Sequence, residues 1–153
     1  MGRKPVNETL REVRPNLWVS DQESAAVLGD DYDLVIDCTG RGPTRGNGHT
    51  VSLLPSGRTN HSWAPDQLNT IVFLATVRLE RGESILIHCR RGVSRSACAA
   101  AAVLLWLEEA KDAKDALSKV AFGDQRMSGH STASLKRWWK AEEEAAQPAL
   151  FDA

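Results

Sequence analysis

The sequence predicts an α/β fold: one compact domain with a short, mostly parallel sheet flanked by helices. The wholly apolar segment 34–36 and the segment 84–87, which is apolar after Ser84, are typical of strands buried on both faces. Longer segments with apolar residues at helical spacing alternate with them. The 153 residues fit one domain and show no repeat or break in composition. We therefore expect a single domain over 1–153 with an ordered core over 10–146.

The N-terminal part predicts extended segments, a short helix and a buried strand. Residues 13–19 favour one or two extended pieces around the turn pair Pro15-Asn16. Asp21 is a suitable N-cap for a short helix that ends at Gly29. After the strand at 34–36 comes a loop over 39–48 that is rich in Gly, Pro and Arg, and 51–54 is a further strand candidate.

The rest of the chain predicts helices around the second buried strand. Residues 65–80 have helical spacing, with Pro65 at the start and Gly82 just beyond the end. The segment 94–110 is apolar nearly all round, so we expect it at the centre of the domain, and amphipathic helices follow over 111–122 and 131–145. Because active sites in such sheets lie beyond the carboxyl ends of strands, Cys38 and Cys89 fall in the expected place.

Composition excludes several classes of protein and partner. Hydrophobic residues are 42% and charged residues 25%, which excludes disorder, collagen and coiled coil. With 19 basic and 20 acidic residues the net charge is −1, so we expect no general nucleic-acid binding. No apolar run is long enough to span a membrane, and three irregularly spaced cysteines favour a reducing compartment. We expect a cytoplasmic monomer.

The sequence also predicts no metal and no cofactor. Its histidines and cysteines lack the spacing of a zinc site. The glycines between 40 and 46 lack the third glycine of a dinucleotide fingerprint and open no helix.

The segment 88–96, between the second buried strand and the central helix, contains the residues expected of an anion site beside a nucleophilic cysteine. A loop of this length turns backbone N–H groups inward, and with the positive end of the helix dipole these form an anion site. Gly92 gives the tight turn its freedom, and Arg95 can fork onto two phosphate oxygens. The same features favour the thiolate of Cys89, a nucleophile that Ser96 can hydrogen-bond. The alternative is an inert core cysteine beside a surface arginine.

The segment His88-Cys89-Arg90-Arg91-Gly92-Val93-Ser94-Arg95-Ser96 resembles the signature of the cysteine-dependent dual-specificity phosphatases, within the protein tyrosine phosphatase superfamily. The similarity extends over residues 13–140, through likenesses of 15–20 and 35–38 to the family's first strands. It implies hydrolysis of phosphate esters on protein, lipid or RNA ends through a phosphocysteine intermediate. Cys89 would be the nucleophile and Arg95 the transition-state clamp, with His88 supporting the thiolate and Ser96 assisting the second step. The cradle for the phosphate would be formed by Arg90, Arg91, Gly92, Val93, Ser94 and Arg95.

The sequence departs from the family at the general acid. Where the family carries an Asp on a loop well before the cysteine, residues 57–60 hold no carboxylate. Asp66 is the candidate acid, but the interpretation of Asp66 as an acidic residue in the first turn of the helix at 65–80 is the favoured one, and His61 is a further candidate. RNA 5′-triphosphatases of the superfamily resemble this sequence in lacking that Asp. A missing acid favours aryl phosphates or phosphoanhydrides over alkyl monoesters.

Four further points stay open in the sequence. Arg90 and Arg91, with Arg41, Arg45 and Arg58, favour a polyanionic substrate such as a phosphoinositide or a triphosphate end, or simply face solvent. In some relatives a strand-end cysteine pairs with the nucleophile, so Cys38 is either a redox partner of Cys89 or a core thiol, while Cys98 is core. The missing acid leaves a phosphate-binding pseudophosphatase as an alternative. A sulfurtransferase-like domain is a third, less favoured, interpretation.

Overall fold

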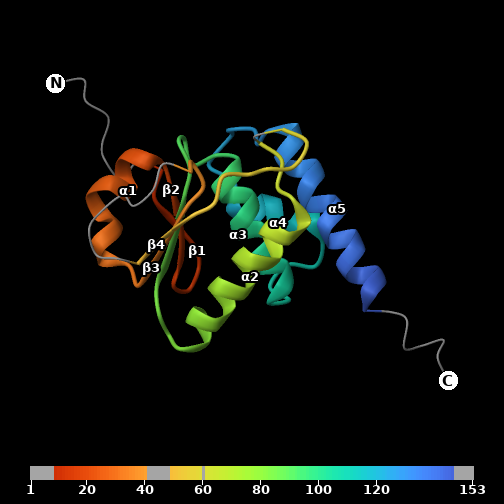
Figure 1. The fold of residues 1–153 in the computed structure, drawn as a ribbon, viewed down its shortest axis with the longest axis horizontal. Helices are drawn as coiled ribbons and strands as arrows, with labels where there is room; N and C mark the ends of the chain where they lie inside the picture. Colours follow the sequence, from red (N-terminus) through yellow and green to blue (C-terminus); the bar gives the residue numbers. More distant parts are fainter. Residues whose placement is uncertain (1–8, 41–48, 60, 147–153) are drawn as a thin grey trace.

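Helices cover both faces of a single sheet in the computed structural model of the chain, which describes residues 9–40, 49–59 and 61–146 (Figure 1). The strands are β1 (Arg11–Arg14), β2 (Leu17–Ser20), β3 (Leu34–Asp37), β4 (Thr50–Ser52) and β5 (Ile85–His88). The helices are α1 (Gln22–Leu28), α2 (Pro65–Glu80), α3 (Arg95–Trp106), α4 (Ala113–Val120) and α5 (Gly129–Ala145), with a 3₁₀ turn at Gly29–Asp31. The predicted α/β class is confirmed.

Strand order in the sheet is β1-β2-β5-β3-β4, with β1 antiparallel to β2 and the other neighbours parallel. The β1–β2 turn falls at the predicted Pro15-Asn16 pair, where Asn16 takes a φ of 70°. Asn is among the few residues that adopt this left-handed conformation at low cost. The two buried strands β3 and β5 are neighbours, and Asp37 pairs with His88 at their carboxyl ends.

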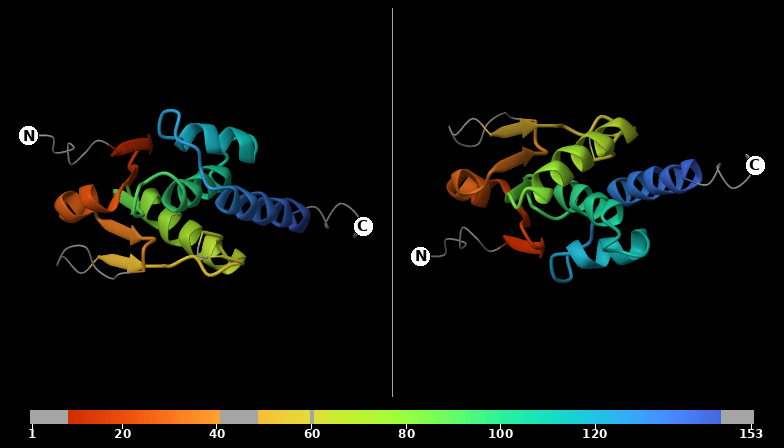
Figure 2. Two further views of the ribbon diagram at one scale, coloured as in Figure 1. Left: turned by 90° about the horizontal axis from the view of Figure 1, so that it is seen from above. Right: turned by 90° about the horizontal axis from the view of Figure 1, so that it is seen from below.

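The two faces of the sheet are divided by the alternation of side chains along its central strands. Ile85 and Ile87 belong to the large core cluster with α2, α3 and α5, whereas Leu86 packs with Val35 and Ala25 under α1. Figures 1 and 2 show α1 on one side of the sheet and the remaining helices on the other. Strands buried on both faces explain why their sequences are continuously apolar.

Helix α3 is the central helix, as predicted. Its residues from Ser96 to Leu105 are all buried, and it contacts β2, β5, α2, α4 and α5. Alanines fill much of its surface (Ala97, Ala99, Ala100, Ala101, Ala102). Because alanine side chains are small, these five neighbouring elements can approach the helix closely, and its N-terminus is fixed within the core.

Element boundaries differ from the prediction in α3, β4, α4 and α5; helix α4 covers Ala113–Val120 and not 111–122. Helix α3 ends at Trp106 and not at 110, because Leu107 caps it and Glu108 takes a φ of 60°. Strand β4 covers Thr50–Ser52, although Leu53 N–H still bonds the carbonyl of Asp37 at 2.8 Å. Helix α5 begins at Gly129, two residues earlier than predicted, since Ser128 is its N-cap and bonds His130 N–H.

Within the described part of the chain no helix has the length and apolar content needed to cross a membrane. The same residues contain no group of three or more His, Cys, Asp or Glu side chains arranged to hold a metal ion.

Candidate active site

The carboxyl ends of β3 and β5 bring Cys38 and Cys89 to one edge of the sheet. Cys38 follows β3 directly and Cys89 follows β5, and the Cys38 N–H donates to the carbonyl of His88 at 2.8 Å. The parallel pairing thus extends one residue beyond the strands before the two chains separate. This juxtaposition was expected from the two strand ends in the sequence.

The loop from Cys89 to Ser94 turns back tightly over the start of α3. Gly92 takes a φ of +73°, and a Cβ there would lie 2.7 Å from the backbone carbon of Ser20. The loop is also tied to the β2–α1 junction, because Gln22 N–H donates to the carbonyl of Arg90 at 3.2 Å. The positive φ and the nearby Ser20 backbone explain why the turn needs glycine, which the sequence predicts at this position.

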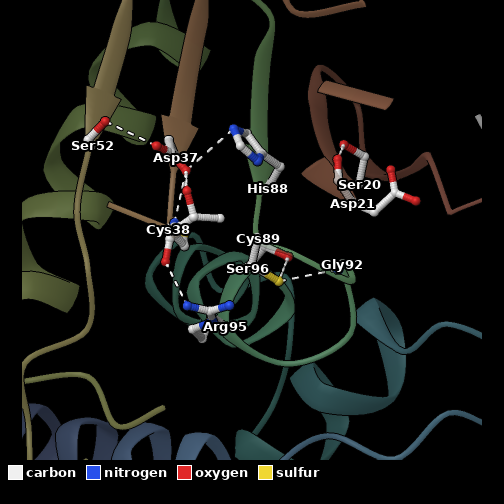
Figure 3. Close-up of polar contacts among 11 residues, drawn as sticks. Ser20, Asp21, Asp37, Cys38, Ser52, His88, Cys89, Gly92, Arg95 and Ser96 are labelled. Carbon is white, nitrogen blue, oxygen red and sulfur yellow. Dashed lines mark hydrogen bonds and ion pairs between the residues drawn. The ribbon is translucent and has the colours of Figure 1, made fainter. Parts of the chain in front are cut away.

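Cys89 lies at the floor of the loop and is 2% exposed. The Gly92 N–H donates to its sulfur at 3.3 Å, and the Ser96 hydroxyl lies 3.1 Å from the same atom (Figure 3). The predicted contact between Ser96 and Cys89 is present in the structure.

Arg95 opens α3 and extends across the floor toward β3. Its Nη1 donates to the carbonyl of Cys38 at 3.3 Å (Figure 3). The carbonyl of Arg95 accepts a bond from the indole Nε1 of Trp63 at 3.1 Å, and Trp63 is 2% exposed. Trp63 therefore fixes the first turn of α3. Sequence reasoning missed this role, although a Trp just before the helix at 65–80 was a signal in the sequence.

Asp37 and His88 form a buried pair under the loop. His88 Nε2 lies 3.7 Å from Asp37 Oδ1, and each side chain is 1% exposed. Burial lowers the pKa of His88 below its ordinary value, while Asp37, Asp21 and the backbone of Cys89 oppose the fall. The imidazole is therefore neutral at neutral pH, and the pair is a polar contact between a carboxylate and a neutral ring.

The Asp37 carboxylate also joins β3, β4 and the loop after β3. Its Oδ1 accepts from the N–H and hydroxyl of Thr39 at 2.8 and 2.5 Å, and its Oδ2 accepts from Ser52 Oγ at 3.1 Å. Sequence reasoning did not single out Asp37. An acidic residue that ends an otherwise apolar strand was the signal, since a buried charge requires partners.

A cavity of about 490 Å³ opens above Cys89. It is larger than one phosphate needs, and the described residues that line it include four arginines and no carboxylate. The lining includes the predicted nucleophile Cys89 and every predicted cradle residue except Gly92, namely Arg90, Arg91, Val93, Ser94 and Arg95; the others are Gln22, Thr39, Leu54, His61 and Arg126. Arg126, from the segment between α4 and α5, was missed because nothing in the sequence connects it with the loop.

The candidate acids fall in different places. Asp66 lies exposed in the first turn of α2 and is absent from the cavity lining, whereas His61 contributes to the lining. Arg58 is exposed and does not line the cavity, and Arg41 and Arg45 lie outside the described residues.

Cys38 and Cys98 are both buried thiols at 0% exposure. Burial is the main cause that raises the pKa of Cys38 well above its ordinary value; the charges of Cys89 and Asp37 add to it and Arg95 opposes it. Burial raises the pKa of Cys98 to about 12, and its sulfur donates to the carbonyl of Ser131 at 3.2 Å. The predicted core position of Cys98 is confirmed, while pairing of Cys38 with Cys89 stays a prediction.

Several solved structures share this architecture. Human DUSP28 superposes with a TM-score of 0.74 at 17% identity, covering 92% of this chain and 99% of that chain. PTPMT1 in complex with PI(5)P gives 0.73 at 16% identity, covering 90% and 98%. Human tyrosine phosphatase-like serine/threonine/tyrosine-interacting protein gives 0.69 at 17% identity, covering 88% and 97%.

No family model matches the sequence, and no curated protein matches it. At identities this low, the structural likeness establishes the fold of the dual-specificity and tyrosine phosphatases for this chain, over nearly the full length of those structures.

Proposed function

We propose that a domain with this phosphatase fold is itself a cysteine-dependent phosphatase that hydrolyses phosphate esters or anhydrides. The observation that carries the proposal is the setting of Cys89: its sulfur receives the Gly92 N–H and faces the Ser96 hydroxyl beneath an arginine-lined cavity. A buried thiol placed only for packing needs neither those donors nor an anion site above it.

In the first step the Cys89 sulfur attacks phosphorus, the bond between phosphorus and the leaving oxygen breaks, and that oxygen departs with the electron pair. Arg95 and the loop N–H groups bind the equatorial oxygens, where charge is held in the transition state. In the second step water attacks the phosphocysteine, its proton passes to solvent, and the sulfur–phosphorus bond breaks. Ser96 then donates its hydroxyl hydrogen bond to the departing thiolate.

We further propose that the enzyme favours substrates with good leaving groups. The cavity lining among the described residues contains no carboxylate, so no lining side chain of that type protonates a departing alkoxide. General acid catalysis is worth about 10²–10⁴-fold, most for poor leaving groups. Aryl phosphates and phosphoanhydrides, whose leaving groups are stable anions, need it least.

The test is steady-state hydrolysis of para-nitrophenyl phosphate by the wild type and by Cys89→Ser. We expect the substitution to lower kcat by roughly 10³-fold or more, because serine is a far weaker nucleophile at neutral pH. Cys98→Ser is the matched control, since that hydroxyl can keep the bond to the Ser131 carbonyl and should leave kcat near the wild-type value. Wild-type protein that binds phosphate or vanadate without turnover would instead support a phosphate-binding pseudophosphatase.

A further inference from the structure

Arg11, near the N-terminus of the described chain, reaches the back of the Cys89 loop. It lies at the start of β1, and its Nη2 donates to the carbonyl of Gly92 at 2.9 Å. The other bonds of the guanidinium go to the Val120 carbonyl, at 2.8 Å from Nη2 and 3.2 Å from Nε, and to the Thr9 carbonyl at 2.8 Å from Nη1. One side chain thereby joins β1, the loop and the end of α4.

The arginine is held in one position. Its guanidinium carbon lies 5.3 Å from the centre of the Phe122 ring, a cation–π distance. Burial lowers the pKa of the Arg11 guanidinium from its ordinary value, and the charge of Cys89 opposes that fall. Because arginine stays protonated in proteins, a fixed positive charge lies behind the sulfur at neutral pH.

The bond to Gly92 acts on the same residue that binds the sulfur. Gly92 accepts a hydrogen bond from Arg11 through its carbonyl. Its N–H donates to Cys89 Sγ at 3.3 Å (Figure 3). Its Cα side is closed by the backbone of Ser20 and Asp21 at 2.7 and 2.8 Å from an added Cβ. With its carbonyl held and its Cα packed, the residue has no freedom to turn its N–H away from the sulfur.

We propose that Arg11 is a positioning residue for the Cys89 nucleophile: it holds the Gly92 peptide so that the N–H stays on the sulfur, and it places a fixed positive charge behind that atom. The proposal rests on the proposed phosphatase function only for its effect on turnover, since the effect on the sulfur is independent of substrate. Arginine is needed because its planar fork reaches three carbonyls at once, which a lysine ammonium on a flexible stem does not.

Other charged or titratable groups face Cys89 and must be held constant in the test. They are Arg90 and Arg91 in the loop, Arg95 at the start of α3, His88 at the end of β5, Cys38 and Asp37 at the end of β3, and Arg126 and His61 across the cavity. The variants described next leave all of them unchanged.

The experiment measures the rate of Cys89 alkylation by iodoacetamide against pH, with mass spectrometry to identify the modified cysteine. Wild type is compared with Arg11→Met, Arg11→Lys and the matched control Arg14→Met. Arg14 is on the same strand but pairs with Glu109 at 2.7 Å on the surface, away from the loop. Turnover of para-nitrophenyl phosphate is measured in parallel, and thermal unfolding confirms that each variant folds.

We expect Arg11→Met to raise the pH midpoint of alkylation by about one unit, as loss of a neighbouring charge does. At pH values below both midpoints this cuts the thiolate fraction about tenfold, and kcat falls to match. Arg11→Lys should give a smaller rise, because the charge remains while the fork is lost. Arg14→Met should leave both quantities unchanged.

An unchanged midpoint in folded Arg11→Met would overturn the proposal, even if the variant were less stable. Should Arg11→Met fail to fold, an Arg11→Lys protein with wild-type midpoint and kcat would overturn it equally. A shifted midpoint in a protein whose wild type turns over no phosphate ester would uphold the role of Arg11 while rejecting the phosphatase proposal. The two failures are therefore distinguishable.

Discussion

At Gly92 the backbone has a φ of +73° and the space beside its Cα is closed by the β2–α1 junction, with Ser20 and Asp21 backbone atoms 2.7–2.8 Å from an added Cβ. Gly82 has almost the same φ, +74°, but nothing lies within 4 Å of its added Cβ. Comparing substitutions at the two positions therefore separates the cost of a left-handed backbone from the cost of steric overlap.

We expect Gly82→Ala to lower the free energy of unfolding by about 1 kcal/mol, the cost of a left-handed alanine. Gly92→Ala should lower it by about 3 kcal/mol or more, because backbone atoms must also move. Urea unfolding measures both. Gly92→Ala should also abolish turnover, and equal stability of the two variants would contradict the close approach at Gly92.

His88 makes the stability of the fold depend on pH. Because burial lowers the pKa of His88 in the folded state, the unfolded chain binds a proton at higher pH than the folded chain does. The contribution of neutral, buried His88 to stability is therefore complete above the pKa of histidine in the unfolded chain, about 6.5, and is lost as pH falls below that value.

We expect the free energy of unfolding of the wild type to fall between pH 7.5 and pH 5.5, about one unit on either side of the unfolded value. His88→Asn should show a flatter profile, measured by urea unfolding at each pH. His130→Asn, at an exposed position of α5, is the control that should keep the wild-type slope. A His88→Asn profile parallel to the wild type would show that the acid sensitivity arises elsewhere.

The sequence identified the site residues that lie within one segment, because strand, loop and helix there are continuous in the chain. Cys89, Arg95 and Ser96 were predicted in this way. Arg11 was not, since it meets Gly92 across 81 residues of sequence. Asp37, Trp63 and Arg126 escaped prediction for the same reason: their contacts exist only after the sheet has formed.

At the scale of the elements, capping residues predicted helix boundaries better than apolar spacing did. Asp21 caps α1 through the Ser24 N–H at 2.7 Å, and α2 spans Pro65–Glu80 as its spacing predicted. Helix α3 stops earlier than its apolar pattern, because residues beyond Trp106 remain apolar in part while the backbone turns at Glu108. Apolar spacing indicates which residues are buried and not where a helix ends, and the chain remains partly buried beyond the end of α3.

Helix α2 determines the setting of Asp66. Its first turn holds Asp66 exposed and outside the cavity lining, where the helix dipole favours a carboxylate. We expect Asp66→Asn to change kcat for para-nitrophenyl phosphate less than threefold and to lower stability by about 0.5 kcal/mol. The same comparison with a phosphoserine peptide is the sharper measurement, because an alkoxide depends most on an acid. A fall of about 10²-fold there would identify Asp66 as the general acid.

At the scale of the whole molecule, strand order assembles the cavity. The order β1-β2-β5-β3-β4 sets β5 between β2 and β3, so the loop after β5 meets both the β2–α1 junction and the end of β3. The sequence predicted parallel strands but not their order, which is decided by how the helices pack on each face. Arg126 enters the cavity only through the arrangement of α4 and α5 against α3.

The distribution of charge over the molecule leads to a prediction about substrate size. The net charge is −1, yet the cavity lining of the described residues has four arginines and no carboxylate, so the positive field is local. In the proposed mechanism Arg95 and the loop N–H groups bind one phosphate, and Arg90, Arg91 and Arg126 would bind further anionic groups. We expect Arg126→Ala to raise KM for tripolyphosphate by about fivefold, the effect of losing one exposed charge-assisted contact.

The change for para-nitrophenyl phosphate, which carries a single phosphate, should be less than twofold. Arg137→Ala, on the exposed surface of α5 and outside the cavity lining, is the control and should change neither KM. Raising ionic strength from about 0.05 to about 0.5 M should weaken tripolyphosphate binding more than that of the monoester, because screening acts on every additional charge pair. If Arg126→Ala and salt change both substrates equally, the outer arginines act only as a general field, and the site is one for single phosphate groups.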